Sequence, residues 1–137
     1  MTLTVSFEHI GLSVANLDRQ IRFYVEAFGF QVTHRTEIAD ADIRIALLSL
    51  PGGAAIEFTE RAGSAPQQFS GPIEGAGIQG YFHWALIVND LDAAVSTAVA
   101  HGARAISQPA PARRPGICFA YVADPEGNLV ELLQRTD

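Results

Sequence analysis

Alternating polarity marks the beginning of the chain. In residues 5–14 the apolar side chains of Ile10, Leu12 and Val14 fall on one side of an extended backbone, and His9 falls on the other. This period of two predicts a strand with one buried face. We expect His9 to point away from that face.

The period then changes to that of a helix. Apolar residues within 17–28 recur at intervals of three and four, which predicts a helix with one buried stripe. Asn16 can cap its N-terminus, and Gly29 can end it. Three short strands are expected next, at 31–37, 43–50 and 54–60. In the last of these Glu57 alternates with apolar neighbours, so its carboxylate should again oppose the buried face.

The second half of the chain repeats this order. After a strand at 82–88, Asp90 can cap a helix over 91–101 that Gly102 ends. Further strands are expected at 104–107, 117–123 and 128–134. Each half therefore reads as strand, helix and three strands, or βαβββ, and the predicted fold class is α+β.

These halves predict a single domain made of two tandem modules. Module one covers 1–60 and module two covers 81–137. The connector, 61–80, holds five glycines and two prolines, which favours an irregular segment over a further element. A connector of this length often contributes to function.

Charged residues are part of the repeat. His9 and His83 lie 74 positions apart, and so do Glu57 and Glu131. Equivalent places in the two modules therefore each carry one imidazole and one carboxylate. A lone strand histidine is more often an ordinary polar residue than a ligand, but four such groups at matched positions favour metal binding.

Imidazole nitrogen and carboxylate oxygen suit particular metals. Without a thiolate, this donor set favours zinc, nickel, cobalt or manganese, with coordination positions left for water or substrate. Such an ion can act as a Lewis acid on a carbonyl or an enediolate.

Composition excludes other classes. The net charge is −6, and all nine basic residues are arginine, so no basic stripe is available for nucleic acid. No apolar run reaches the roughly 18 residues that a membrane span needs. A single cysteine, Cys118, suits a reducing compartment. We therefore expect a cytoplasmic protein with neither a nucleic-acid nor a membrane partner.

Several motifs resemble those of the vicinal oxygen chelate superfamily, which includes glyoxalase I, bleomycin-resistance proteins and extradiol dioxygenases. They are the opening Phe7-Glu8-His9-Ile10-Gly11-Leu12, the helix end Phe28-Gly29-Phe30, the second His83 and the closing Asp124-Pro125-Glu126-Gly127-Asn128-Leu129-Val130-Glu131. The resemblance covers nearly the whole chain. It implies paired modules that form a curled, eight-stranded mixed sheet, the glyoxalase-like fold.

The resemblance also implies a site and a reaction. His9, Glu57, His83 and Glu131 would hold a divalent ion, with ligands from one chain or across a homodimer. The His, Glu, His, Glu pattern favours a redox-neutral lyase or isomerase of the glyoxalase or epimerase type. The ion would chelate neighbouring oxygens of a small substrate, and Glu57 or Glu131 would move a proton through an enediolate.

Substrate and alternative function stay open. Arg113 and Arg114 could meet a substrate carboxylate or phosphate, and Tyr121 could hydrogen-bond a ligand, although a solvated loop and a core aromatic explain them as well. Ser13 and Arg61 stand where bacterial glyoxalase I enzymes typically carry an arginine and an asparagine for glutathione. The alternative function is a bleomycin-resistance type protein that binds a drug or metabolite without chemistry, in a groove lined by Phe7, Phe69, Phe82 and Trp84.

Overall fold

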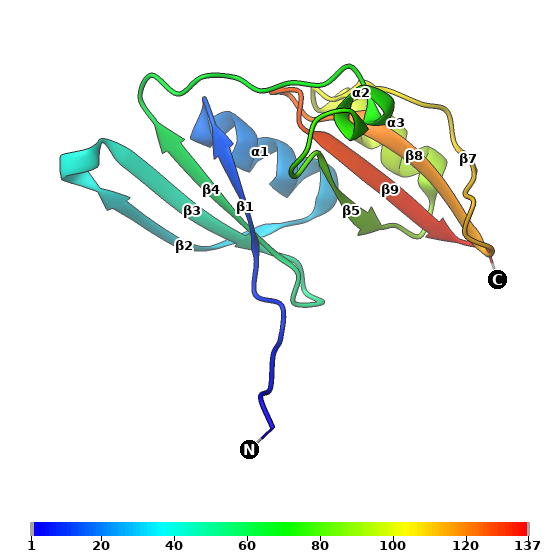
Figure 1. Cartoon of the computed structure of the whole chain (residues 1–137), viewed down its shortest axis with the longest axis horizontal. Helices are drawn as coiled ribbons and strands as arrows, with labels where there is room; N and C mark the ends of the chain where they lie inside the picture. The colour runs from blue at the N-terminus through cyan, green and yellow to red at the C-terminus, as the bar shows by residue number, and fades with distance from the viewer. Residues whose placement is uncertain (1, 137) are drawn as a thin grey trace. The chain divides into compact units, whose positions relative to one another are not determined.

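A computed structural model describes residues 2–136, which cluster into two compact units. Of the described residues, 2–25 and 29–65 form the first unit, and 26–28 and 66–136 form the second. Each unit is built around its own sheet, and the two sheets together contain nine strands (Figure 1). The α+β class that the sequence predicts is confirmed.

The first sheet has four strands. Its elements are β1 (Ile10–Val14), α1 (Leu17–Phe28), β2 (Gln31–Ile38), the 3-10 turn η1 (Ala39–Ala41), β3 (Ile43–Ser49) and β4 (Ala55–Arg61). The strand order is β1-β4-β3-β2, with β1 parallel to β4 and the other pairs antiparallel. Fully buried Ile56 and Phe58 of β4 form part of the core, and Tyr24 of α1 packs on Phe58 at a ring-centre distance of 5.3 Å.

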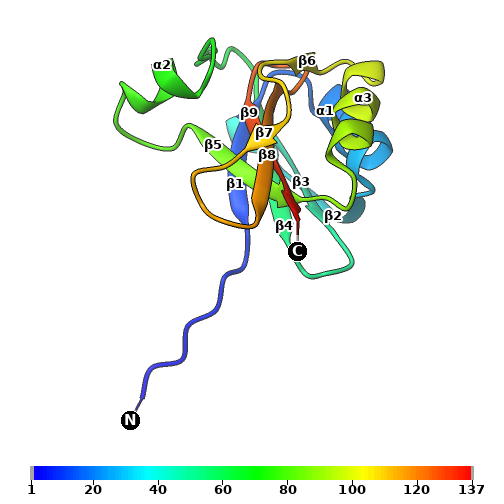
Figure 2. The ribbon, with the colours of Figure 1, turned by 90° about the vertical axis from the view of Figure 1, so that its right-hand side faces the viewer.

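The second sheet repeats this topology. Its elements are α2 (Pro72–Ala76), β5 (His83–Ile87), α3 (Leu91–Ala100), β6 (Arg104–Ala105), β7 (Ala110–Pro111), β8 (Ile117–Ala123) and β9 (Leu129–Arg135). The order is β5-β9-β8-β6, with β5 parallel to β9 and β7 paired to β8. Helix α3 packs against β8 and β9, and α2 lies on the opposite side of these strands (Figure 2).

Helix caps follow the sequence pattern in both units. The Asn16 side chain accepts a hydrogen bond from the Arg19 N–H at 3.0 Å, and the Asp90 side chain accepts one from Ala93 at 3.0 Å. Gly29 ends α1 with φ of 76°, a left-handed conformation that costs glycine nothing. The two side-chain caps fix the residue at which each helix begins after the first strand of its module.

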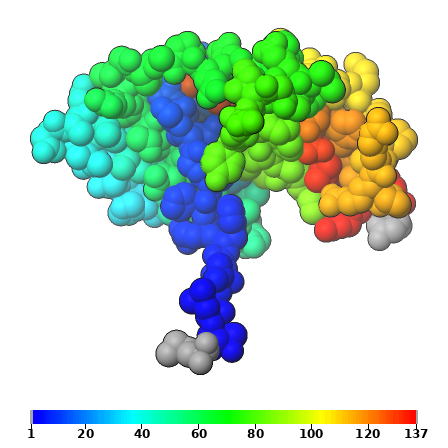
Figure 3. Space-filling model, in the orientation of Figure 1, coloured from blue at the N-terminus to red at the C-terminus, as the bar shows by residue number. Residues whose placement is uncertain are grey.

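The first strand is shorter than the alternation predicts. It begins at Ile10, which pairs with Ile56, and in this register residues 5–8 lie beyond the beginning of β4 at Ala55. Residues 2–9 extend away from the sheet of their own unit, and Phe7 is 79% exposed (Figures 1 and 3). His9 therefore directly precedes β1 and does not lie within it.

Two further expectations need correction. The single strand expected at 104–107 is replaced by β6 and β7, so the second sheet has five strands and not four. Pro109 and Pro111 lack the N–H that would extend one continuous ladder there. The connector 61–80 contains α2, whose Pro72 suits the first helical turn and whose Glu74 accepts hydrogen bonds from the N–H and hydroxyl of Ser70.

Candidate metal-binding residues

The first candidate pair is formed by His9 and Glu57. Glu57 lies in β4 between fully buried Ile56 and Phe58, so its side chain points to the face opposite the core, as the alternation predicts. The His9 Nε2 atom lies 3.8 Å from Glu57 Oε2, and both side chains are 35% exposed. His9 directly precedes β1, which is the hydrogen-bonded neighbour of β4, so its ring lies close to Glu57.

A second carboxylate contacts the His9 ring. Glu8 Oε1 lies 3.3 Å from His9 Nδ1. A carboxylate on one ring nitrogen is a common support for a metal-binding histidine, because it favours the tautomer whose other nitrogen has a free lone pair. This contact would leave Nε2 of His9 as the metal-facing atom.

His83 and Glu131 form the second pair. Glu131 lies in β9 between fully buried Val130 and Leu132, and its side chain therefore points away from that core. His83 Nε2 lies 3.1 Å from Glu131 Oε2. The two modules match in detail, since Glu57 pairs with Gly11 across β1 and β4 while Glu131 pairs with Ala85 across β5 and β9.

Both distances fit the donor spacing of a divalent ion. Two donors at about 2.0–2.2 Å from one ion lie about 3 Å apart at a right angle and up to about 4 Å apart at wider angles. The 3.8 Å and 3.1 Å separations fall in this range. His83 Nδ1 is buried, and no hydrogen bond to it is formed among residues 2–136. A buried polar atom without a hydrogen bond costs free energy, so the surroundings of this ring are incompletely satisfied.

Within the described residues, no group of three or more His, Cys, Asp or Glu side chains has the arrangement of a metal site. Each pair by itself provides two donors, which is too few for the four-coordinate sites that zinc prefers. A complete site therefore needs more than one pair.

Tyr121 adjoins the second pair. It lies in β8 directly across from Glu131 in β9, and its ring meets the His83 ring edge-on at 5.4 Å. Burial, the charge of Glu131 and a hydrogen bond between the two side chains together raise the pKa of Tyr121 to about 12. Tyr121 is thus a neutral phenol on the strand beside Glu131, a proximity that the sequence did not reveal.

The other suggested residues lie in different surroundings. Arg113 and Arg114 are exposed in the turn between β7 and β8. Phe69 is buried in a core cluster with Tyr121, Ala123 and Leu129, so it packs inside the second unit and does not face an open groove.

The sequence analysis missed a second contact that occurs in both modules, between a polar side chain of the last strand and the first N–H of the helix. Glu60 Oε2 accepts a hydrogen bond from the Leu17 N–H, and Gln134 Oε1 accepts one from the Leu91 N–H, both at 2.7 Å. The interval of 74 positions relates both partners, so the repeat could have indicated them.

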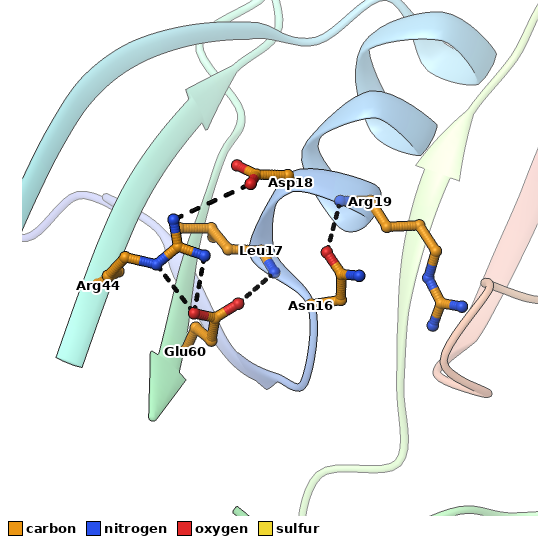
Figure 4. Close-up of polar contacts among 6 residues, drawn as sticks. All are labelled: Asn16, Leu17, Asp18, Arg19, Arg44 and Glu60. Atoms are coloured by element: carbon orange, nitrogen blue, oxygen red, sulfur yellow. Dashed lines mark hydrogen bonds and ion pairs between the residues drawn. The ribbon is translucent and has the colours of Figure 1, made fainter. Parts of the chain in front are cut away.

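Glu60 also pairs with Arg44, whose guanidinium lies 2.8 Å away (Figure 4). The Leu17 N–H, followed by Arg44, lowers the pKa of Glu60. A polar cavity of about 270 Å³ adjoins this contact, and none of the four candidate ligands lines it. The lining residues are Ala15, Asp42, Arg44, Glu60, Arg61, Ala62, Gly63 and Ser64.

Comparison with known proteins identifies the family of the chain. The family model described as Glyoxalase/Bleomycin resistance protein/Dioxygenase superfamily matches residues 6–132. The chain belongs to this superfamily. The resemblance seen in the sequence motifs is therefore confirmed, and all four candidate ligands lie inside the matched region.

Relatives within the superfamily carry one recurrent name. A lactoylglutathione lyase of Arabidopsis thaliana is 28% identical over 132 residues, which cover 94% of this chain and 44% of that protein. A Vibrio cholerae protein named "Probable lactoylglutathione lyase" is 30% identical over 130 residues, covering 93% and 88%. The chain thus spans less than half the length of the plant relative and most of the bacterial one.

A solved structure supports the fold. The crystal structure of a glyoxalase family protein from Bacillus cereus matches with a TM-score of 0.83 at 20% identity, covering 99% of this chain and 97% of that one.

No helix among residues 2–136 is long and apolar enough to cross a membrane.

Proposed function

We propose that this chain is a divalent-metal-dependent lyase or isomerase of the glyoxalase or epimerase type. The observation that carries the proposal is the duplicated His–Glu contact, in which the two glutamates have the same strand register and the N···O distances are 3.8 and 3.1 Å. The names of the lactoylglutathione lyase relatives support the same class of reaction.

Under this proposal both pairs hold one ion. His9, Glu57, His83 and Glu131 would be its ligands, from one chain or from two chains of a homodimer, and zinc, nickel, cobalt or manganese suits them. When bound, the ion would polarise neighbouring oxygens of the substrate and make an adjacent C–H group more acidic.

The chain's own carboxylates would then move the proton. Glu57 or Glu131 would take a proton from the substrate carbon and return it to the same carbon or to the next one. The product has the same overall oxidation level as the substrate, so the step needs no redox partner.

Substrate recognition is a separate part of the proposal. We expect a small molecule with adjacent oxygens, and we retain Arg113 and Arg114 as candidates for a carboxylate or phosphate on it. The cytoplasmic location and the homodimer remain predictions of the same kind.

Two measurements test this function. Elemental analysis of protein purified without added metal should find a stoichiometric divalent ion. Incubation in heavy water with hemithioacetals, hydroxy-ketones and acyl-CoA esters should then show deuterium incorporation into one class, and a chelator should abolish it. A metal-free protein that exchanges no deuterium with any of the three classes would overturn the proposal.

A further inference from the structure

The segment before the first strand, residues 2–8, exposes a row of apolar side chains. We refer to this segment as the N-terminal arm (Figures 1 and 3). Leu3, Val5 and Phe7 are 83%, 80% and 79% exposed, and they alternate with polar residues. This alternation is typical of a strand that buries one face, yet in the single chain the apolar face is open to solvent.

The backbone of the arm is available for pairing. The ladder between β1 and β4 begins at Ile10, and among residues 2–136 no strand pairs with the arm. An extended segment whose backbone N–H and C=O groups are outside any ladder is a template for a further strand. The arm is therefore suited to pair with another extended chain.

The order of apolar and polar residues in the arm is the same in both directions from Val5. Leu3 and Phe7 lie two positions from it, and Thr4 and Ser6 lie one position from it. When two copies of the arm pair antiparallel around Val5, Leu3 of each copy lies opposite Phe7 of the other, and Val5 lies opposite itself. In no other antiparallel register does each apolar side chain of the arm face another of them. A second copy of the arm is therefore a partner that fits this pattern.

The charge of the arm favours the same arrangement. Glu8 is the one ionisable side chain in residues 2–8. In the antiparallel pair it lies opposite Thr2 of the other copy. In a parallel pair in register, the two Glu8 carboxylates would face each other, and like charges directly opposite destabilise a sheet. The antiparallel pair also has twofold symmetry, the commonest symmetry of homodimers.

We propose that the N-terminal arm is a dimer interface, in which residues 2–8 of two copies of this chain pair as antiparallel strands centred on Val5. The apolar side chains of both copies then lie on one face of a two-stranded ribbon, where cross-strand neighbours shield one another from water. A ribbon of two strands is only marginally stable by itself. We therefore expect a dimer that dissociates on dilution. The inference depends on neither the metal nor the reaction.

A charge placed at the centre of the interface tests the proposal. Val5→Lys would set two ammonium groups directly opposite each other and should raise the dissociation constant of the dimer about 10-fold or more in analytical ultracentrifugation. Val5→Glu should do the same, and an equimolar mixture of the two variants should recover the dimer. Thr4→Lys is the matched control, because it adds the same charge one position away, opposite Ser6 on the polar face. It should dimerise as the wild type does.

Cysteine variants test the register. Residues directly opposite each other in antiparallel strands have Cα atoms about 4.5–5.5 Å apart, a separation that a disulfide spans. With Cys118 replaced by serine, Val5→Cys should form disulfide-linked dimers under mild oxidation. Leu3→Cys and Phe7→Cys should each give little crosslinked dimer alone and should form a mixed disulfide dimer when combined.

Several outcomes would overturn the inference. One is a wild-type protein that sediments as a monomer at every concentration measured, which is expected if the arm packs on its own chain or on an unrelated partner. Another is a dimer that Val5→Lys leaves unchanged. Leu3→Cys that crosslinks alone as strongly as Val5→Cys would rule out the proposed register. Because the substituted side chains of the arm are exposed in the single chain, circular dichroism should show an unchanged fold in each variant.

Discussion

The carboxylate of Glu60 accepts a 2.7 Å hydrogen bond from the backbone N–H of Leu17, the first residue of α1 (Figure 4). The last strand of the module thereby satisfies one of the free N–H groups at the beginning of its helix. In the second module Gln134 makes the same contact with Leu91. A carboxylate in one module and an amide in the other thus accept the same hydrogen bond from the helix, so glutamine is a natural test replacement for Glu60.

Replacement of Glu60 should distinguish this cap from the ion pair with Arg44. Glu60→Ala removes both and should lower the free energy of unfolding by about 1–2 kcal/mol. Glu60→Gln keeps an acceptor for Leu17, as Gln134 does for Leu91, and should cost less. Urea denaturation measures both variants. Equal losses would mean that the ion pair, and not the cap, provides the stability.

Acid should remove the contribution of Glu60. Its pKa in the folded protein lies below the ordinary value of 4.5, so the folded state favours the charged form. The resulting stability is fully present above 4.5 and is lost as the pH falls through the lower folded value. Unfolding measured from pH 7 to pH 3 should show a smaller acid loss in Glu60→Gln than in the wild type. The same acid dependence in both would contradict this assignment.

Asp124 should stabilise the closing turn of the second module. Its Oδ1 atom accepts hydrogen bonds from the backbone N–H groups of Glu126 and Asn128, both at 2.9 Å, and the residue is buried. Asp124→Ala would leave these donors without their partner and should cost about 2–3 kcal/mol. Asp124→Asn retains one acceptor oxygen and should cost less. Thermal unfolding of both variants checks this order, and a neutral Asp124→Ala would refute it.

The two glutamates are predicted to be essential for turnover. Replacement of Glu57 or Glu131 by glutamine removes a base or a charged ligand, and we expect each change to abolish deuterium exchange more than it weakens substrate binding. Steady-state kinetics on the active substrate class would show this as a fall in kcat with a smaller change in KM. Unchanged turnover in both variants would refute the catalytic role of the carboxylates.

Much of the fold follows from patterns in the sequence. The caps Asn16 and Asp90 and the stop at Gly29 depend on local hydrogen bonding and backbone conformation, so neighbouring residues suffice to predict them. The side chains of Glu57 and Glu131 point away from the core, and this follows from the alternation of apolar and polar residues along single strands. Local patterns do not determine where pairing ends, which is why the first strand begins at Ile10 and not at residue 5.

The candidate site was predictable only in part. The repeat identifies His9 and His83 as equivalent, because duplication preserves position in the sequence. The neighbourhood of Tyr121 was harder to predict, since this residue pairs with Glu131 across two strands, whereas the residue across from Glu57 is Leu47, which lacks a hydroxyl. The contact between Glu60 and Leu17 likewise joins groups that are 43 positions apart.

The central claim is that both histidines serve one divalent ion. Calorimetric titration of the metal-free protein with Co²⁺ should give a single class of sites in the wild type, and His9→Ala and His83→Ala should each abolish tight binding. Because His9 and His83 come from different modules, loss in both variants is the result expected of a shared ion. Wild-type affinity in either variant, with its fold confirmed by circular dichroism, would contradict the account.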